Sequence, residues 1–148
     1  MRLFDNFGRL PEGLFSLKIY RRGRLIEVFE EKNLIVSNSQ QIHAKLLGGA
    51  VAGQSVTQIG FGTSLTPAAS GNNSLTNPFM KALDSVSYPA ANQVSFNFSL
   101  LSSEDNGANI GEFGLFTAGG TLYARKVRTA AIPKDTDLSF SGSWIISF

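Results

Sequence analysis

The sequence predicts a mainly β protein: a β-sandwich of about seven to nine antiparallel strands with one packed α-helix at residues 38–47. Three observations support this fold class. Apolar and polar residues alternate strictly at 94–100 and again at 138–148, the period of a half-buried strand. The segments 14–31 and 110–127 each place a short Gly-containing turn between two apolar runs, which is typical of β-hairpins.

The 148 residues are enough for one domain with one core. We expect a single β-sandwich domain at 14–148, preceded by an N-terminal arm at 1–13. Apolar residues recur in the arm at roughly helical spacing: Leu3, Phe4, Phe7 and Leu10. Such an arm must pack either on its own domain or on a neighbouring subunit. Phe4, Phe7 and Leu10 are therefore candidate interface residues.

The first hairpin, 14–31, has its turn at Arg22-Gly23. A two-residue loop would place Lys18 opposite Glu27, a stabilising cross-strand pair. The same register predicts a core face made of Phe15, Leu17, Ile19, Ile26 and Val28. Arginines surround the turn at Arg21, Arg22 and Arg24. They are candidate contacts for an acidic partner or an anion, with a solvated turn as the alternative.

The helix at 38–47 is predicted from a capping box, with Ser37 as the N-cap and Gln40 three residues later. Ile42 and Leu46 lie on one face of it, and Gly48-Gly49 ends it.

The middle of the chain reads as strand and turn. A short strand is expected at 56–61, followed by a long exposed loop at 62–76 that contains Pro67 and Gly71 and many Ser, Thr and Asn residues. The segment 79–86 is ambiguous and is compatible with a strand after Pro78.

In the second hairpin, 110–127, the Gly119-Gly120 loop sets the register. One face is core and carries Phe113, Leu115, Leu122 and Ala124. The other face mixes aromatic and charged residues, with Glu112 diagonal to Arg125 and able to pair with it. Phe116, Tyr123 and Arg125 on this face are candidate interface residues. The alternative is a second core layer covered by the helix.

Composition narrows the function classes. The chain has no Cys, so thiol chemistry is excluded, and its net charge of +2 does not favour a nucleic-acid partner. No apolar run approaches the length of a membrane span, and no signal-peptide core is recognisable. We expect a soluble protein made in the cytoplasm, without a membrane partner.

Catalytic motifs are not recognisable either. His43 is the single histidine, and its position beside the apolar stripe favours a packed or surface role over proton transfer. The acidic segment 104–109 has its Gly wrongly placed for a calcium loop, which argues against a calcium site of the EF-hand type. The sequence does not decide whether this segment binds an ion. We predict that the protein is not an enzyme and has no catalytic residues, cofactor or metal.

Eight segments, in this order, carry a resemblance to a known family. They are NLIV at 33–36, TQIGFGT at 57–63, NPFMK at 77–81, EDNG at 104–107, IGEFGLF at 110–116, GTLYAR at 120–125, IPKD at 132–135 and WIISF at 144–148. Their order resembles the small β-domains of tail-fibre, tail-collar and baseplate-associated proteins of tailed bacteriophages and prophages.

This resemblance implies a non-enzymatic virion structural protein, made in the host cytoplasm and located in the virion. As a tail-fibre, baseplate or collar component it would assemble as an oligomer, a homotrimer, contact other virion proteins and mediate attachment or assembly. Longer relatives continue into a fibre shaft, whereas this chain stops at Phe148. A trimeric capsid decoration (cement) protein that stabilises the head therefore remains an alternative.

A carbohydrate-binding module is a further alternative, with Tyr88 or Trp144 as the platform on which a host surface glycan would stack.

Overall fold

The structure, a computed structural model, describes residues 11–148. It contains one helix, α1 (Ser39–Gly48), and nine strands. The strands are β1 (Glu12–Arg21), β2 (Arg24–Ile35), β3 (Val56–Gly62), β4 (Phe79–Ala82), β5 (Ser85–Ser87), β6 (Gln93–Leu100), β7 (Asn109–Thr117), β8 (Leu122–Pro133) and β9 (Leu138–Ser147). The mainly β fold with a single short helix is thus confirmed.

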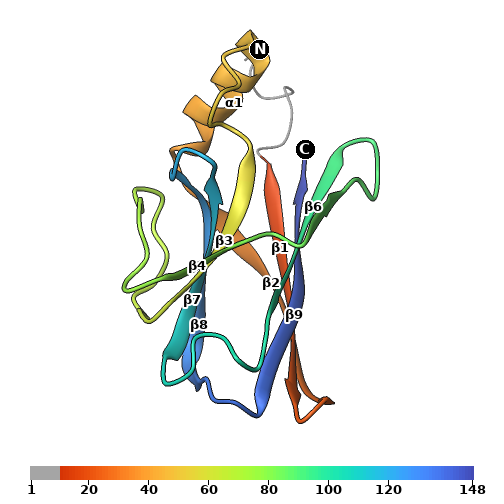
Figure 1. Cartoon of the computed structure of the whole chain (residues 1–148). Helices are drawn as coiled ribbons and strands as arrows, with labels where there is room; N and C mark the ends of the chain where they lie inside the picture. Colours follow the sequence, from red (N-terminus) through yellow and green to blue (C-terminus); the bar gives the residue numbers. More distant parts are fainter. Residues whose placement is uncertain (1–10) are drawn as a thin grey trace, which may run out of the picture.

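All nine strands belong to one antiparallel sheet with the order β4-β3-β7-β8-β2-β1-β9-β6-β5. The sheet curls, so that its two halves face one another as the two layers of the expected sandwich (Figure 1). The two edge strands are neighbours in the chain. The two residues that connect β4 to β5 continue the pairing on each side: the Leu83 amide donates to Thr57 O on β3, and the Asp84 amide donates to Asn97 O on β6. The segment 79–87 therefore forms both edge strands of the sheet. The ambiguous segment is therefore two short strands.

The core lies between the two halves. The ring of Phe15 on β1 lies 4.7 Å from that of Phe113 on β7 and 4.9 Å from that of Trp144 on β9. All three side chains are fully buried. Trp144 Nε1 donates to Asn33 Oδ1 at 2.7 Å, which satisfies its polar atom inside the core.

The first hairpin has the predicted two-residue turn, with Arg21 opposite Arg24, but the predicted register beyond it is wrong. A bulge between Ile19 and Tyr20 shifts the pairing by one residue, so Ile19 faces Glu27 and Lys18 faces Val28. Phe15, Leu17 and Ile19 are buried as expected. Ile26 and Val28, by contrast, are 50% and 58% exposed. A shift of the register by one residue turns side chains of β2 that were expected in the core to the opposite face of the sheet.

The helix forms within a residue of its predicted bounds, but its predicted capping box is absent. Asn38 is the N-cap, has helical torsion angles and makes no side-chain capping bond. Backbone bonds from Ser39 N to Val36 O and from Gln40 N to Ser37 O satisfy the first amides instead. Gly49 ends the helix with a left-handed φ of 88°, as predicted.

The predicted arm, 1–13, lies outside the described residues as far as Leu10. Its last two residues, Glu12 and Gly13, already belong to β1. Phe4, Phe7 and Leu10 are therefore not placed.

Candidate functional site

The mixed face of the second hairpin is buried inside the chain. Phe116, Tyr123 and Arg125 are only 7%, 4% and 3% exposed, so the structure contradicts the predicted subunit interface at these residues: their side chains are buried within the chain. Tyr123 packs in the main core between the two halves of the sheet, where α1 contacts it: His43 Nε2 and Tyr123 Oη lie 2.8 Å apart. The predicted face of Leu122 is also wrong. A bulge between Leu115 and Phe116 pairs Phe116 with Leu122, so Leu122 takes the place predicted for Tyr123 and packs against Phe116.

The long loop that follows β3 covers part of this face, through an ion pair that sequence spacing predicted. Arg125 Nε donates to Glu112 Oε1 at 2.9 Å. The other carboxylate oxygen, Glu112 Oε2, accepts from the amides of Ser64 and Thr76, each at 2.9 Å. Arg125 also donates to Thr66 O. The loop is thus pinned at both of its ends, although most of its side chains are exposed as expected.

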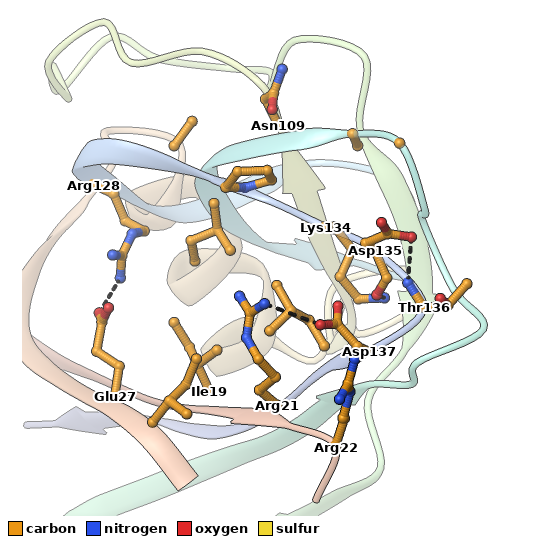
Figure 2. A pocket seen from close by; sticks show the side chains of 17 residues that line it. Ile19, Arg21, Arg22, Glu27, Asn109, Arg128, Lys134, Asp135, Thr136 and Asp137 are labelled. Atoms are coloured by element: carbon orange, nitrogen blue, oxygen red, sulfur yellow. Dashed lines mark hydrogen bonds and ion pairs between the residues drawn. The ribbon is translucent and has the colours of Figure 1, made fainter. Parts of the chain in front are cut away.

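A cleft with a volume of about 850 Å³ lies at the tip of the first hairpin (Figure 2). We call it the hairpin-tip cleft. It is bordered by the β1–β2 turn on one side and by the end of β8 and the start of β9 on the other. Arg21 and Arg22, predicted as interface residues, line it together with Arg128, and Arg24 is exposed beside it.

The guanidinium groups of this cleft are largely neutralised by carboxylates. Arg21 Nη1 donates to Asp137 Oδ2 at 3.1 Å, and Arg128 Nη1 donates to Glu27 Oε2 at 2.9 Å (Figure 2). The Arg22 amide donates to Asp137 O at 2.8 Å and fixes the turn on β9. A cleft with paired charges fits a polar protein surface better than a free anion, which would have to compete with these carboxylates.

An apolar groove, also about 850 Å³ in volume, lies at the opposite end of the sheet, between α1, the β5–β6 hairpin and the last residue. Figure 1 shows α1, the β5–β6 hairpin and the C-terminus at this end. Four apolar side chains on its wall are exposed: Leu46 (38%), Val86 (45%), Tyr88 (76%) and Phe148 (53%). Burial lowers the pKa of His43 and raises that of Tyr123 on the inner wall.

Of the two aromatic platforms expected for a glycan, the structure buries one. Trp144 is 0% exposed, so it cannot stack on a sugar, whereas Tyr88 lies on the wall of the apolar groove.

Residues 104–109 surround a side chain that the sequence did not single out. Lys134 is only 2% exposed, and its Nζ donates to Asn106 Oδ1 at 2.8 Å and to Ser102 O at 3.3 Å. The residues on either side of Lys134, Pro133 and Asp135, show no alternation of apolar and polar side chains that would indicate burial, so this contact was not predictable from the sequence.

Among residues 11–148, no three His, Cys, Asp or Glu side chains gather as a metal site would require. The same part of the chain has no helix that is both long and apolar enough to cross a membrane.

The fold and its two open ends define an antiparallel β protein with a polar cleft at one end and an apolar groove at the other. No family model, no curated protein and no solved structure matches this chain.

Proposed function

We propose that this chain is a non-enzymatic structural component of a tailed-bacteriophage virion, in a tail-fibre, baseplate or collar position. It acts by assembling into a homotrimer and by contacting other virion proteins. The order of the eight sequence segments that resemble such domains supports this proposal, and the structure adds surfaces that suit assembly.

The observation that carries the proposal is the apolar groove. Leu46, Val86, Tyr88 and Phe148 come from α1, β5, the β5–β6 connection and the C-terminus, and all keep more than a third of their surface exposed. Apolar side chains that gather from several elements into one open surface mark a protein contact more often than chance exposure does. The groove therefore serves as the contact between copies.

The hairpin-tip cleft supports the contact with other virion proteins. Its paired charges, Arg21 with Asp137 and Arg128 with Glu27, resemble the polar rim of a protein interface. The β1–β2 turn, which borders the cleft, and α1, which borders the groove, lie at opposite ends of the sheet (Figure 1), so one copy can use the groove and the cleft at the same time.

Light-scattering mass of the full chain over a hundredfold concentration range tests the proposal. We expect a trimer that dissociates on dilution, and a Leu46→Asp variant that requires at least about ten times more protein to assemble, because a charge in the groove loses its water on contact. Leu47→Asp is the matched control. Leu47 is the next residue of α1, is 92% exposed and is not part of the groove wall, so this variant should assemble like the parent chain.

A monomer at every concentration, together with antibodies that fail to label particles of the phage or prophage encoding the chain, would overturn the proposal. Antibody position on labelled particles also distinguishes a tail component from the capsid decoration alternative. Binding to a glycan array, abolished by Tyr88→Ala, would instead favour the carbohydrate-binding alternative.

A further inference from the structure

We propose that the side chains of Lys134 and Asn106 join in an intramolecular isopeptide bond, with Asp105 as the acid that assists the reaction. The bond would tie the β6–β7 connection to the β8–β9 connection. It is a property of the folded chain and does not depend on the proposed virion role.

The first support is the position of the nucleophile. Lys134 is 2% exposed, although lysine is almost never fully buried, and its Nζ lies 2.8 Å from Asn106 Oδ1. Backbone bonds hold both sides of the contact: Lys134 N donates to Ala108 O, and Gly107 N donates to Lys134 O, each at 2.9 Å. The amine and the carboxamide are thus held together by the fold, which removes most of the entropic cost of bringing two reactants together.

The second support is the neighbouring acid. Asp105 precedes Asn106 in the loop, and its Oδ2 atom is shielded from solvent and has no hydrogen-bond partner. Burial raises the pKa of Asp105, and burial lowers the pKa of Lys134. Both changes favour the neutral forms, a carboxylic acid and a free amine, which are the forms that the reaction requires. The charges of Asp105, Glu104, Asp135 and Asp137 oppose the change in the pKa of Lys134 because they favour the ammonium form, and the Lys134 charge opposes the change in the pKa of Asp105, but burial is the larger effect at both groups.

The reaction balances without an oxidant or a co-reactant. A proton passes from the Lys134 ammonium to the Asp105 carboxylate, and the free Nζ attacks Cγ of Asn106. The Nζ–Cγ bond forms and the Cγ–Nδ2 bond breaks. After the attack, Nζ loses one proton to Asp105, and Asp105 passes a proton to Nδ2. Nδ2 then leaves as ammonia. One amine and one primary amide become one secondary amide and ammonia. Asn106 is exposed, so the ammonia can leave into solvent.

A competing reaction starts from the same side chain. In an Asn-Gly sequence the backbone nitrogen of Gly can attack the Asn side chain and form a succinimide, which also releases ammonia. Here the amide of Gly107 donates to Lys134 O at 2.9 Å and is held away from that attack. The fold therefore favours Lys134 Nζ as the nucleophile.

Intact mass spectrometry of the purified full chain tests the proposal. We expect a mass about 17 Da below that of the sequence, which is the mass of one ammonia. A tryptic digest should contain peptide 82–125 covalently joined to peptide 129–148, since Lys134 would no longer be cleaved. The full sequence mass with separate peptides, in protein that has been kept folded for days, would overturn the proposal.

Two variants separate the roles. Lys134→Arg keeps a charged donor but removes the nucleophile, so its mass should be that of its sequence. A 17 Da loss that persists in this variant would identify the succinimide and overturn the proposal. Asp105→Asn keeps the loop polar and should slow bond formation at least tenfold, and formation at the parental rate would overturn the role given to Asp105. Circular dichroism checks that both variants fold, and the joined peptides in the parent chain remain decisive if one of them does not.

Discussion

Arg125 and Glu112 form an ion pair with an N–O distance of 2.9 Å in which the side chains are only 4% and 1% exposed. The pair joins β7 to β8. Glu112 Oε2 and Arg125 Nη2 bind backbone of the loop that covers the sheet, and Arg125 Nη1 donates to Asn72 Oδ1 of the same loop. One buried pair thus holds an irregular segment in place.

Glu112→Gln should lower the free energy of unfolding by about 3–5 kcal/mol, because it leaves the buried Arg125 charge without its partner. Urea denaturation measures this loss. Glu27→Gln is the matched control: Glu27 pairs with Arg128 at the surface with 43% of its side chain exposed, so its loss should not exceed about 1 kcal/mol. Hydrogen exchange of the Ser64 and Thr76 amides should also accelerate in Glu112→Gln. Unchanged exchange would contradict the pinning of the loop.

His43 should make the stability depend on pH. Burial holds its pKa in the folded chain below the ordinary value of 6.5, so the unfolded chain binds a proton more readily. The contribution is complete above pH 6.5 and is lost as the pH falls through that value toward the folded-state pKa. The urea midpoint of the parent chain should therefore decrease between pH 7.5 and pH 5 more steeply than that of His43→Gln. Parallel curves for the two proteins would contradict this prediction.

Gly142→Ala should destabilise the chain by about 1–3 kcal/mol, because a Cβ atom there would meet Ser16 O and the ring of Phe98. The neighbours are a backbone atom and a packed core ring, and neither can move freely. Gly71→Ala has nothing within 4 Å of the added atom and should change stability by less than about 0.5 kcal/mol. Thermal unfolding of the two variants side by side tests the difference, and equal melting temperatures would argue against close packing at Gly142.

Phe15→Ala should cost about 3–5 kcal/mol, since it opens a cavity between the two halves of the sheet. Phe15 contacts the rings of Phe113 and Trp144 at centroid distances of 4.7 and 4.9 Å. Leu25→Ala, at a residue that is 47% exposed, should cost less than about 1 kcal/mol. Denaturant midpoints measure both, and the emission of Trp144 should shift to longer wavelength in Phe15→Ala alone.

Local patterns predicted the elements well. Strict alternation located β6 and β9, because side chains of a strand point to opposite faces with a period of two. The pairing of Glu112 with Arg125 also followed from spacing. A two-residue loop at Gly119-Gly120 predicts Glu112 opposite Val127 and Leu115 opposite Ala124, and the structure has both of these pairs.

The predictions failed where one residue changes the register or where distant segments meet. The bulge after Ile19 exposed Ile26 and Val28 and moved Glu27 away from Lys18 to Arg128 on β8. A bulge inserts its extra residue without a strong local signal, so spacing alone could not reveal it.

The candidate sites show the same difference between what local spacing predicts and what long-range packing decides. Local spacing predicted that Phe116, Tyr123 and Arg125 share one face of a hairpin, because strand periodicity is a property of neighbouring residues. A bulge pairs Phe116 with Leu122 instead, so Tyr123 packs in the main core on the other face. Whether each face meets solvent or becomes core depended on α1 and the loop after β3, which lie far away in the chain. The burial of Lys134 against Asn106 has the same origin, since two connections 28 residues apart meet at one end of the curled sheet. Periodicity reports which residues lie on the same side, and only long-range packing determines what covers them.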